Sequence, residues 1–508
     1  MPSLLETIAN WDDRASPSEA KYFFAPVQLE KDINGLTSGS KCFVVGSKGA
    51  GKSAVLEHIV AEARSSDIVI RNKFSPKNLK DFCAQTAEDS VRGADLELLW
   101  TYYICAKACL KLAEKKLGIL RRFDLGAKYG LSARRSWWQR LWRVLPKFRR
   151  FKIDHQGVEF TTVDAPLEEG GGLALPVPRN PVSKMFLWGV HSDIAIEDVI
   201  AAQKAARVRV FVLFDEIDQA IGQSQDKQSF DDYLATVGAL LSSVHSLRTK
   251  FNNENAAICP IVAIRNDIYE AITFSDKSAL NSRKIDLLYK DREQLRPIIA
   301  HRISKALGAA GKSASSADFE KIWRKAVLEL GPLRDDNSVY SRISRRTLNR
   351  PRDYVQYLKL AAIEQMSMKP LRKLIAYQAV SRAADTFSAF FLQEFKDEIS
   401  FRYPKADRLV DVFRVICSDP KRNRFTFAQF EAACQGRGIE DDRGTYVDLA
   451  KHLFVVSVFG VYVKAEGETT PSLNFRYRDE RLAFPGALDD PGTLFGLHTG
   501  FLRALHGD

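Results

Sequence analysis

The stretch KCFVVGSKGAGKSAVLEHIV, residues 41–60, places a glycine-rich turn between an apolar run and a segment of helical periodicity. The run KCFVV is apolar and β-rich, as a buried parallel strand is. After the turn, Val55, Leu56, Ile59 and Val60 repeat at helical spacing. The stretch therefore predicts a strand, a tight turn and a helix in an α/β fold.

The turn matches the pattern GxxxxGK[ST] in the strand and helix context that the pattern requires. Backbone N–H groups must converge on phosphate oxygens here, so side chains have to be absent where the chain wraps closely. Lys52 would reach the β- and γ-phosphates, and Ser53 would give a hydroxyl to Mg²⁺. A turn without a ligand is the alternative, and the pattern arises by chance in about a few per cent of such chains. The predicted phosphate-binding residues are Gly46, Ser47, Lys48, Gly49, Ala50, Gly51, Lys52 and Ser53.

A second motif lies in ARVRVFVLFDEIDQAI, which starts at Ala206 and contains the predicted strand 210–214. Asp215 and Glu216 follow that strand directly, and a carboxylate at the carboxyl end of a central parallel strand points into the crevice where ligands bind. Asp215 is therefore predicted to hold Mg²⁺ together with Ser53, and Glu216 to polarise the attacking water. The alternative is an acidic turn after a strand. Glu216 and Lys52 are the predicted catalytic residues.

These two motifs resemble those of P-loop ATPases of the AAA+ and STAND type, and the core also resembles the KAP group of P-loop proteins. The resemblance implies a parallel sheet with helices on both faces, ATP and Mg²⁺ as ligands, and hydrolysis of ATP to ADP and phosphate. In AAA+ proteins a polar residue at the end of a further core strand senses the γ-phosphate. Arg265 or Asn266, after the predicted strand 261–264, is the matching residue here, and an ordinary strand-end turn is the alternative.

Later segments resemble the helical lid of the same proteins. Arg283 stands before the predicted last core strand, 285–289, where the family often places an arginine that reaches the nucleotide of a neighbouring subunit. Pro351 suits the first turn of a helix. Arg350 and Arg352 then lie near the place of the lid arginine that contacts the phosphates, and a capped helix with surface arginines is the alternative.

From Phe387 onward the pattern resembles the winged-helix domains that often follow such cores. It predicts three helices, a strand, a returning strand at SLNFRYRD and a closing helix at FGLHTGFLRAL. Few basic residues fall on the presumed second helix, so DNA contact is not indicated. The predicted division is a P-loop core at 1–290 with a basic subdomain inserted at about 75–205, a helical lid at 291–384, and a winged-helix-like domain at 385–508.

The insertion carries a basic segment rich in tryptophan. Between Arg121 and Lys152 there are eleven Lys or Arg residues and one acidic residue, and Trp137, Trp138 and Trp142 share one predicted helical face. Residues 134–152 therefore fit a membrane surface, a nucleic-acid backbone or an acidic partner protein, and a helix packed on the core by its tryptophans is the alternative. The stretch EEGGGLALPVPRNPVS, from Glu168, predicts a flexible loop or linker.

Membrane spans occur at this place in the KAP group, but LWTYYICAKACLKLAEKK is interrupted here by Lys107 and Lys111, so a span is not expected. The N-terminus lacks the pattern of a secretory signal. Seven cysteines at irregular spacing favour reduced thiols in the cytoplasm, and neither they nor the histidines indicate zinc.

Three hypotheses for the output remain open. The first is an active ATPase that couples its nucleotide state to movement of the lid and winged helix. The second is a slow nucleotide switch of the STAND type that oligomerises with itself or signals to a protein partner, and the third is a nucleic-acid-binding module centred on the basic segment. Proteins of this architecture occur in bacterial defence loci, so the resemblance also implies an antiviral role.

Overall fold

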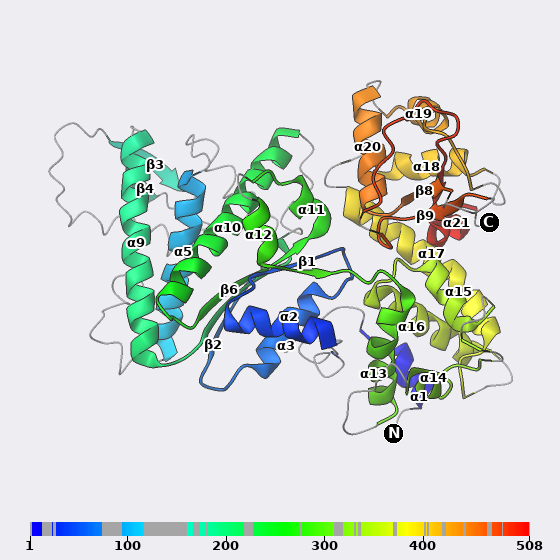
Figure 1. Cartoon of the computed structure of the whole chain (residues 1–508), viewed down its shortest axis with the longest axis horizontal. Helices are drawn as coiled ribbons and strands as arrows, with labels where there is room; N and C mark the ends of the chain where they lie inside the picture. The colour runs from blue at the N-terminus through cyan, green and yellow to red at the C-terminus, as the bar shows by residue number, and fades with distance from the viewer. Residues whose placement is uncertain are drawn as a thin grey trace.

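The computed structural model describes residues 3–12, 23, 27–73, 94–115, 160–165, 173–178, 181–217, 227–274, 277–308, 318–329, 332–333, 337–368, 373–400, 403, 406–418, 423–439, 443–464, 470–479 and 481–506. An α/β core lies at the left of Figure 1, and a largely helical C-terminal part lies at the right. The basic segment 134–152 lies outside the described residues.

A five-stranded parallel sheet forms the centre of the core, with strand order β2-β5-β6-β1-β7. All carboxyl ends of parallel strands meet at one edge, so the residues after β1, β5 and β6 become neighbours. In register, Gly46 lies opposite both Arg265 and Leu287. The strands are β1 (Phe43–Gly46), β2 (Ile68–Lys73), β5 (Val210–Asp215), β6 (Ile258–Arg265) and β7 (Lys284–Leu287). Strand β6 is longer than the predicted 261–264, and β7 ends before the predicted residue 289.

Helices cover both faces of this sheet, which confirms the predicted fold class. Successive residues of β5 face opposite sides of the sheet. Phe211 and Leu213 pack in a hydrophobic core with α3, whereas Val212 and Phe214 pack in a second core with α5 and α10. The helices on the first face are α2 (Val27–Ser38) and α3 (Lys52–Glu62), and those on the second are α5 (Ala94–Lys115), α9 (Pro181–Ala206) and α10 (Lys227–Asn253). Two short helices, α11 (Asn266–Ala271) and α12 (Lys277–Ser282), follow β6.

The long connection between β2 and β5 contains regular structure. Helices α5 and α9 pack against each other in it, and β3 (Phe160–Ala165) pairs antiparallel with β4 (Leu173–Pro178). The linker predicted from Glu168 is therefore wrong for 173–178, which form a strand, and for the residues from Pro181, which begin α9. A two-stranded ribbon leaves each strand an outer edge where proline needs no ladder hydrogen bond, which explains why the prolines permit a strand. No helix within the described ranges is both long enough and apolar enough to span a bilayer.

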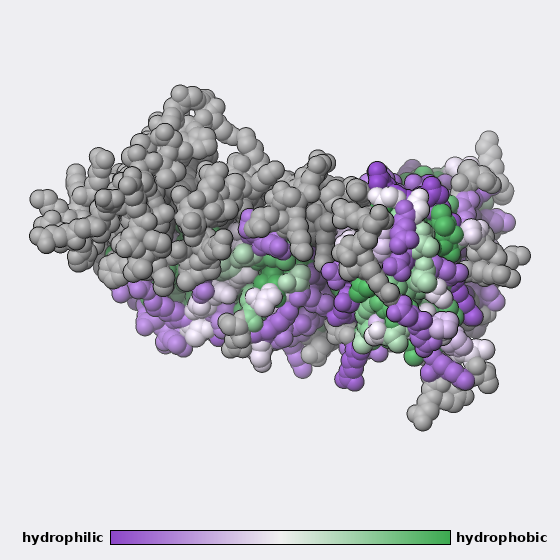
Figure 2. Space-filling model, turned by 90° about the horizontal axis from the view of Figure 1, so that it is seen from above, coloured by the Kyte–Doolittle hydropathy of each residue, from purple (hydrophilic) through white to green (hydrophobic). Residues whose placement is uncertain are grey.

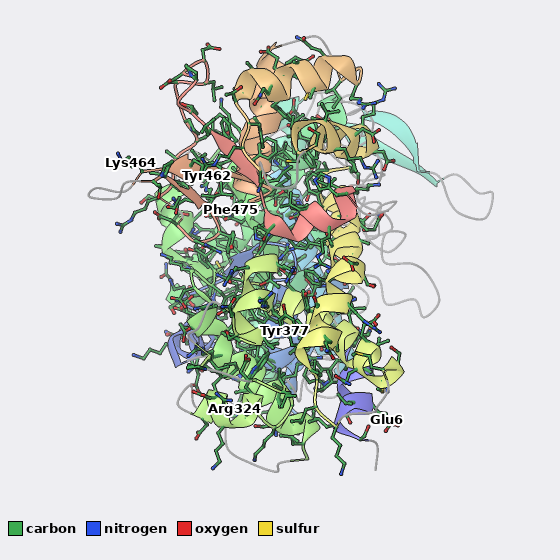
Figure 3. The ribbon with its side chains drawn as sticks, turned by 90° about the vertical axis from the view of Figure 1, so that its right-hand side faces the viewer. Glu6, Arg324, Tyr377, Tyr462, Lys464 and Phe475 are labelled. Atoms are coloured by element: carbon green, nitrogen blue, oxygen red, sulfur yellow. The ribbon has the colours of Figure 1, made fainter. Side chains whose placement is uncertain are left out.

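The helical part after the core also receives the start of the chain. Leu5, Ile8 and Trp11 share a core with α13, α14 and α16, and Glu6 and Arg324 lie at the same end of the molecule in Figure 3. A long helix, α17 (Tyr377–Ile399), stands where the core and this part meet in Figure 1. The other helices are α1 (Leu4–Ala9), the 3-10 helix η5 (Arg292–Leu295), α13 (Arg296–Ala306), α14 (Phe319–Trp323), α15 (Val339–Arg346) and α16 (Pro351–Ser367).

The last region has three helices followed by an antiparallel sheet of order β10-β8-β9. Tyr462 on β8, Lys464 and Phe475 lie at its end of the molecule in Figure 3, opposite Glu6. The elements are α18 (Ala406–Ile416), α19 (Phe427–Gly436), α20 (Arg443–Val455), β8 (Phe459–Val463), β9 (Ser472–Asn474), β10 (Phe495–Leu497) and α21 (Thr499–His506).

This element order agrees with the predicted one except at FGLHTGFLRAL. Its first three residues form strand β10, which pairs with β8, and the helix begins only at Thr499. The assignment of the region as a winged helix stays a prediction. Figure 2 shows hydrophobic residues of the C-terminal part reaching the surface among hydrophilic ones. Exposed apolar side chains interspersed in this way do not by themselves indicate a partner surface.

Candidate functional site

The turn between β1 and α3 uses its three glycines for different reasons. Gly46 is crowded, because a Cβ there would lie 3.0 Å from the Cβ of Leu287. Gly49 and Gly51 have φ angles of 82° and 102°, which side-chain-bearing L residues rarely adopt. A Cβ on Gly51 would meet no atom within 4 Å, so this residue faces open space at the start of α3.

Lys52 folds back over the turn. Its Nζ donates hydrogen bonds to the carbonyl oxygens of Gly46 and Ser47, each at 3.0 Å. The helix start behind it has Gly51 as N-cap with no side-chain capping bond. An ammonium group and uncapped helix N–H groups are thus directed to the same turn, which is the electrostatic pattern of an anion site.

The two sequence motifs meet at the carboxyl edge of the sheet. The hydroxyl of Ser53 donates to Asp215 Oδ1 at 3.1 Å, and the same oxygen accepts the backbone N–H of Glu216 at 2.9 Å. Glu216 itself has a φ of 57°, in the left-handed region that costs a non-glycine residue about 1–2 kcal/mol. The structure thus brings Ser53 and Asp215, 162 positions apart in sequence, into direct contact.

The oxygens of Ser53 and Asp215 suit Mg²⁺, which prefers hard oxygen donors and usually takes one or two carboxylates with water and substrate phosphates. Across the part of the chain that the structure describes, no group of three or more His, Cys, Asp or Glu side chains could hold a metal ion by itself. The residues present therefore fit a magnesium ion that completes its ligands from phosphate and water.

Arg265 ends β6 and Asn266 begins α11, and both side chains form hydrogen bonds to residues outside the turn. The Arg265 guanidinium bonds the Asp267 carboxylate at 3.0 and 2.7 Å and lies 3.3 Å from Glu398 Oε1 on α17. Asn266 Nδ2 donates to Glu270 at 3.0 Å. Burial alone would raise the pKa of Asp267, but the adjacent Arg265 charge outweighs it and holds that pKa below its usual value. Sequence placed both residues at the strand end correctly, whereas the structure directs Arg265 toward α17.

The start of α16 contacts the turn directly. The backbone N–H of Arg352 donates to Gly49 O at 3.4 Å, and Arg350 Nη1 donates to Lys48 O at 2.9 Å. Arg350 is also held by Asp353 at 3.1 Å, and both side chains are buried. The turn, which belongs to the core, is therefore attached to the helical part by backbone and arginine contacts.

Two carboxylates of α17 complete these contacts, and sequence reasoning missed both. Glu394 Oε2 lies 2.7 Å from Arg352 Nη1 and 3.4 Å from Lys48 Nζ. Glu398 lies 3.3 Å from Arg265 and 3.9 Å from Arg350. No sequence signal distinguished them, because acidic residues on a long amphipathic helix are usually solvated.

Sequence reasoning also missed a half-buried lysine of the inserted region that contacts the edge strand β2. Lys107 on α5 donates to Asn72 Oδ1, which also accepts from Tyr103 Oη at 2.9 Å. Burial, with a smaller effect of Lys111, lowers the pKa of Lys107 to about 8. Asn72 lies near the end of β2, directly opposite Phe214 in register, so α5 is fixed next to the Asp215 strand.

Arg283 lies at the amino end of β7, whereas the turn lies at the carboxyl ends of the strands. Its backbone oxygen accepts from Cys42 at 2.9 Å, and its Nη2 donates to Thr249 at 3.0 Å. Arg283 therefore does not reach the turn of its own chain. Its action on a neighbouring subunit stays a prediction.

This chain resembles known proteins only weakly in sequence and in structure. The chain is similar to the Orc1 protein of Aeropyrum pernix, solved in complex with DNA, at 12% identity and a TM-score of 0.36, covering 93% of this chain and 94% of that one. It is similar to Cdc6p of Pyrobaculum aerophilum at 11% identity and a TM-score of 0.31, covering 96% and 95%. Because these TM-scores are low, the description of the fold rests on the strand order and helix packing given above and not on these two structures. A comparison with curated proteins gives no significant match. Residues 293–396 match the family described as the FunZ-associated C-terminal helical domain.

Proposed function

We propose that this chain binds ATP with Mg²⁺ at residues 46–53 and hydrolyses it to ADP and phosphate. The observation that carries the proposal is the 3.1 Å hydrogen bond from Ser53 to Asp215, because it unites the phosphate-binding pattern with the acidic strand end. A glycine-rich turn without a ligand has no need of a carboxylate from a distant strand at that position.

Each residue has a distinct role in the proposed reaction. The backbone N–H groups of the turn and the Lys52 ammonium bind β- and γ-phosphate oxygens, which replace the carbonyl oxygens that Lys52 contacts at 3.0 Å. Ser53 and Asp215 would hold Mg²⁺, which supplies positive charge to the phosphate oxygens when bound. Glu216 orients the attacking water and accepts its proton.

The proposal includes coupling of the nucleotide state to the helical part. Arg350 and Arg352 bond backbone atoms of the turn, so a change of the turn on nucleotide binding reaches α16 without an intermediary. In this proposal Arg352 contacts the nucleotide from the lid, as the sequence predicts. Arg265 and Asn266 would sense the nucleotide indirectly, through the residues that they bond, Asp267 and Glu398 for Arg265 and Glu270 for Asn266. The division into core, lid and a winged-helix domain from residue 385 belongs to the same proposal.

ATP turnover by two variants tests this function. Glu216→Gln removes the proposed base and should lower turnover by about 10²–10⁴-fold while nucleotide binding persists. Lys52→Ala should abolish binding itself. Matched controls are Asp286→Asn on the edge strand β7 and Lys41→Ala before β1, which should both behave as the wild type. Unchanged turnover in Glu216→Gln refutes the role of Glu216, and unchanged ATP binding in Lys52→Ala refutes the site.

A slow switch of the STAND type is the second candidate, favoured by the contact of the turn with Arg350, Arg352 and Glu394. Such a switch changes assembly state with nucleotide and turns over slowly. Light scattering with and without ATP tests this candidate. If ATP leaves the size of the protein particle unchanged, both alone and with candidate partners, the switch is refuted. Nucleic-acid or membrane binding by 134–152, a cytoplasmic location and an antiviral role rest on the sequence alone.

A further inference from the structure

We infer that Glu394 is an internal competitor for the cations of the phosphate site, so that ATP binds by displacing it and thereby detaches α17 from the turn. The inference rests on the proposed function and adds a residue that sets the nucleotide affinity of the same site. Figure 1 shows α17 at the junction of the core with the C-terminal part, where such a displacement changes the attachment of the two.

The geometry of Glu394 supports competition. A single oxygen, Oε2, lies 2.7 Å from Arg352 Nη1 and 3.4 Å from Lys48 Nζ, and the Glu394 side chain is 17% exposed. Lys48 belongs to the turn itself, and Arg352 packs on it so closely that a Cβ at Gly49 would lie 3.1 Å from the Arg352 Cβ. A carboxylate therefore lies on two positive groups that border the turn proposed to bind phosphate.

The second carboxylate of α17 holds the attachment in place. Glu398 lies one helical turn beyond Glu394 on the same face, within 3.3 Å of Arg265. Its arginine neighbours each keep a further carboxylate, since Arg265 bonds Asp267 and Arg350 bonds Asp353. Loss of Glu398 therefore removes one of several bonds in a buried network. Loss of Glu394 instead removes a carboxylate that lies on Lys48, a cation of the turn.

Electrostatics makes simultaneous occupancy unfavourable. Phosphate oxygens bound in the turn add negative charge beside Lys48, the cation that Glu394 contacts at 3.4 Å, and like charges in a partly buried site repel. When ATP binds, Lys48 and Arg352 exchange the Glu394 carboxylate for phosphate. Only the difference between the two interaction free energies contributes to the ATP affinity. Neutralising Glu394 removes both the repulsion and the competition, so ATP should bind about tenfold more tightly, within the usual range of coupling between two sites.

Titration of the full-length protein with ATP and Mg²⁺ tests this. Glu394→Gln keeps the shape of the side chain and removes its charge, and it should bind ATP about tenfold more tightly than the wild type. Asp397→Asn on the same helix is the matched control, because Asp397 is exposed and bonds Gln393 at 2.8 Å away from the turn. It should leave the affinity unchanged. Glu394→Asp, which keeps the charge but shortens its reach, should give an intermediate affinity and serves if the glutamine variant does not fold.

Hydrogen exchange of residues 47–51 without nucleotide gives a second readout. Exchange should be faster in Glu394→Gln than in the wild type, because the turn loses its contact with α17. Equal or weaker ATP affinity in Glu394→Gln, together with Lys52-dependent binding in the wild type, overturns the competition and leaves the proposed function standing. Absence of Lys52-dependent ATP binding in the wild type and in Glu394→Gln overturns both.

Discussion

Alanine at Gly49 and at Gly51 should destabilise the protein to different extents. The two residues are two positions apart in one turn, and both have φ angles in the left-handed region, 82° and 102°. Their surroundings differ. A methyl group at Gly49 would meet the Cβ and Cδ of Arg352 at 3.1 and 3.2 Å, whereas at Gly51 it would meet no atom within 4 Å. Comparing the two variants therefore distinguishes the cost of the left-handed backbone from the cost of packing the turn against α16.

The magnitudes follow from these contacts. The left-handed backbone costs an alanine about 1–2 kcal/mol at either position, and the loss of unfolded-state freedom on replacing glycine is common to both. Only Gly49→Ala adds overpacking, about 1–3 kcal/mol, because the Arg352 Cβ is fixed to the helix backbone and cannot rotate away. Gly51→Ala should lose about 1–2 kcal/mol and Gly49→Ala about 2–5 kcal/mol in total.

Urea unfolding without nucleotide, followed by far-ultraviolet circular dichroism, measures the difference. The midpoint should fall in the order wild type, Gly51→Ala, Gly49→Ala. Gly308→Ala, at a left-handed glycine after α13 with open space around it, reports the backbone cost alone away from the turn. Equal midpoints for the two turn variants would refute the close packing of Arg352 on Gly49.

Three further predictions concern single residues. Glu216→Gly should raise the free energy of unfolding by about 0.5–1 kcal/mol, because glycine relieves the left-handed strain at φ 57°, and it should abolish ATP turnover. A lower free energy of unfolding contradicts this. Burial, with the charges of Arg478 and Arg350, lowers the pKa of His498 from 6.5 to about 3. As the pH falls, the unfolded state therefore takes up the proton first, and the free energy of unfolding should fall by about 2 kcal/mol between pH 6.5 and pH 5. His498→Gln should lose that part of the pH dependence of the melting temperature. Arg248→Met should lower the free energy of unfolding in urea by about 3 kcal/mol, because it removes the buried guanidinium's hydrogen bonds to three backbone carbonyl oxygens, of which Gly39 O keeps a bond from Asn252.

The central sheet and the turn could be predicted because their signals are local. Residues 41–60 carry an apolar run, glycines and helical periodicity in one continuous stretch, and the apolar run before Asp215 is equally plain. The contact between Ser53 and Asp215 followed from general topology, since parallel strands end at one edge. Glycine and proline content was a poorer guide at 173–178, because a hairpin partner 13 residues earlier decides that segment.

The contacts that surround the turn could not be predicted, because they depend on how distant helices pack. Arg265 at the end of β6 has the residue type and position of a phosphate sensor, but the nearby Asp267 and Glu398 determine where its guanidinium lies. Glu394 is 346 positions from Lys48 and resembles any surface glutamate of an amphipathic helix. Periodicity identifies the buried face of such a helix, but not the element that covers it.

Helices α1 and α21 both pack against elements that follow the α/β core, and this has a consequence for synthesis. Leu5 and Ile8 of α1 share its core, and the last helix, α21, is tied to α17 by hydrogen bonds from Ser388 to Gly500 and from Ala504 to Ser388. At about 5–20 residues per second the ribosome completes the α/β core well before the final segment emerges. Helix α1 must therefore wait for α13 and α16 to be synthesised, and α17 lacks its hydrogen bonds with α21 until residues 499–506 have emerged. In a nascent chain, the turn should therefore lack its contact with Glu394 until α17 has been synthesised.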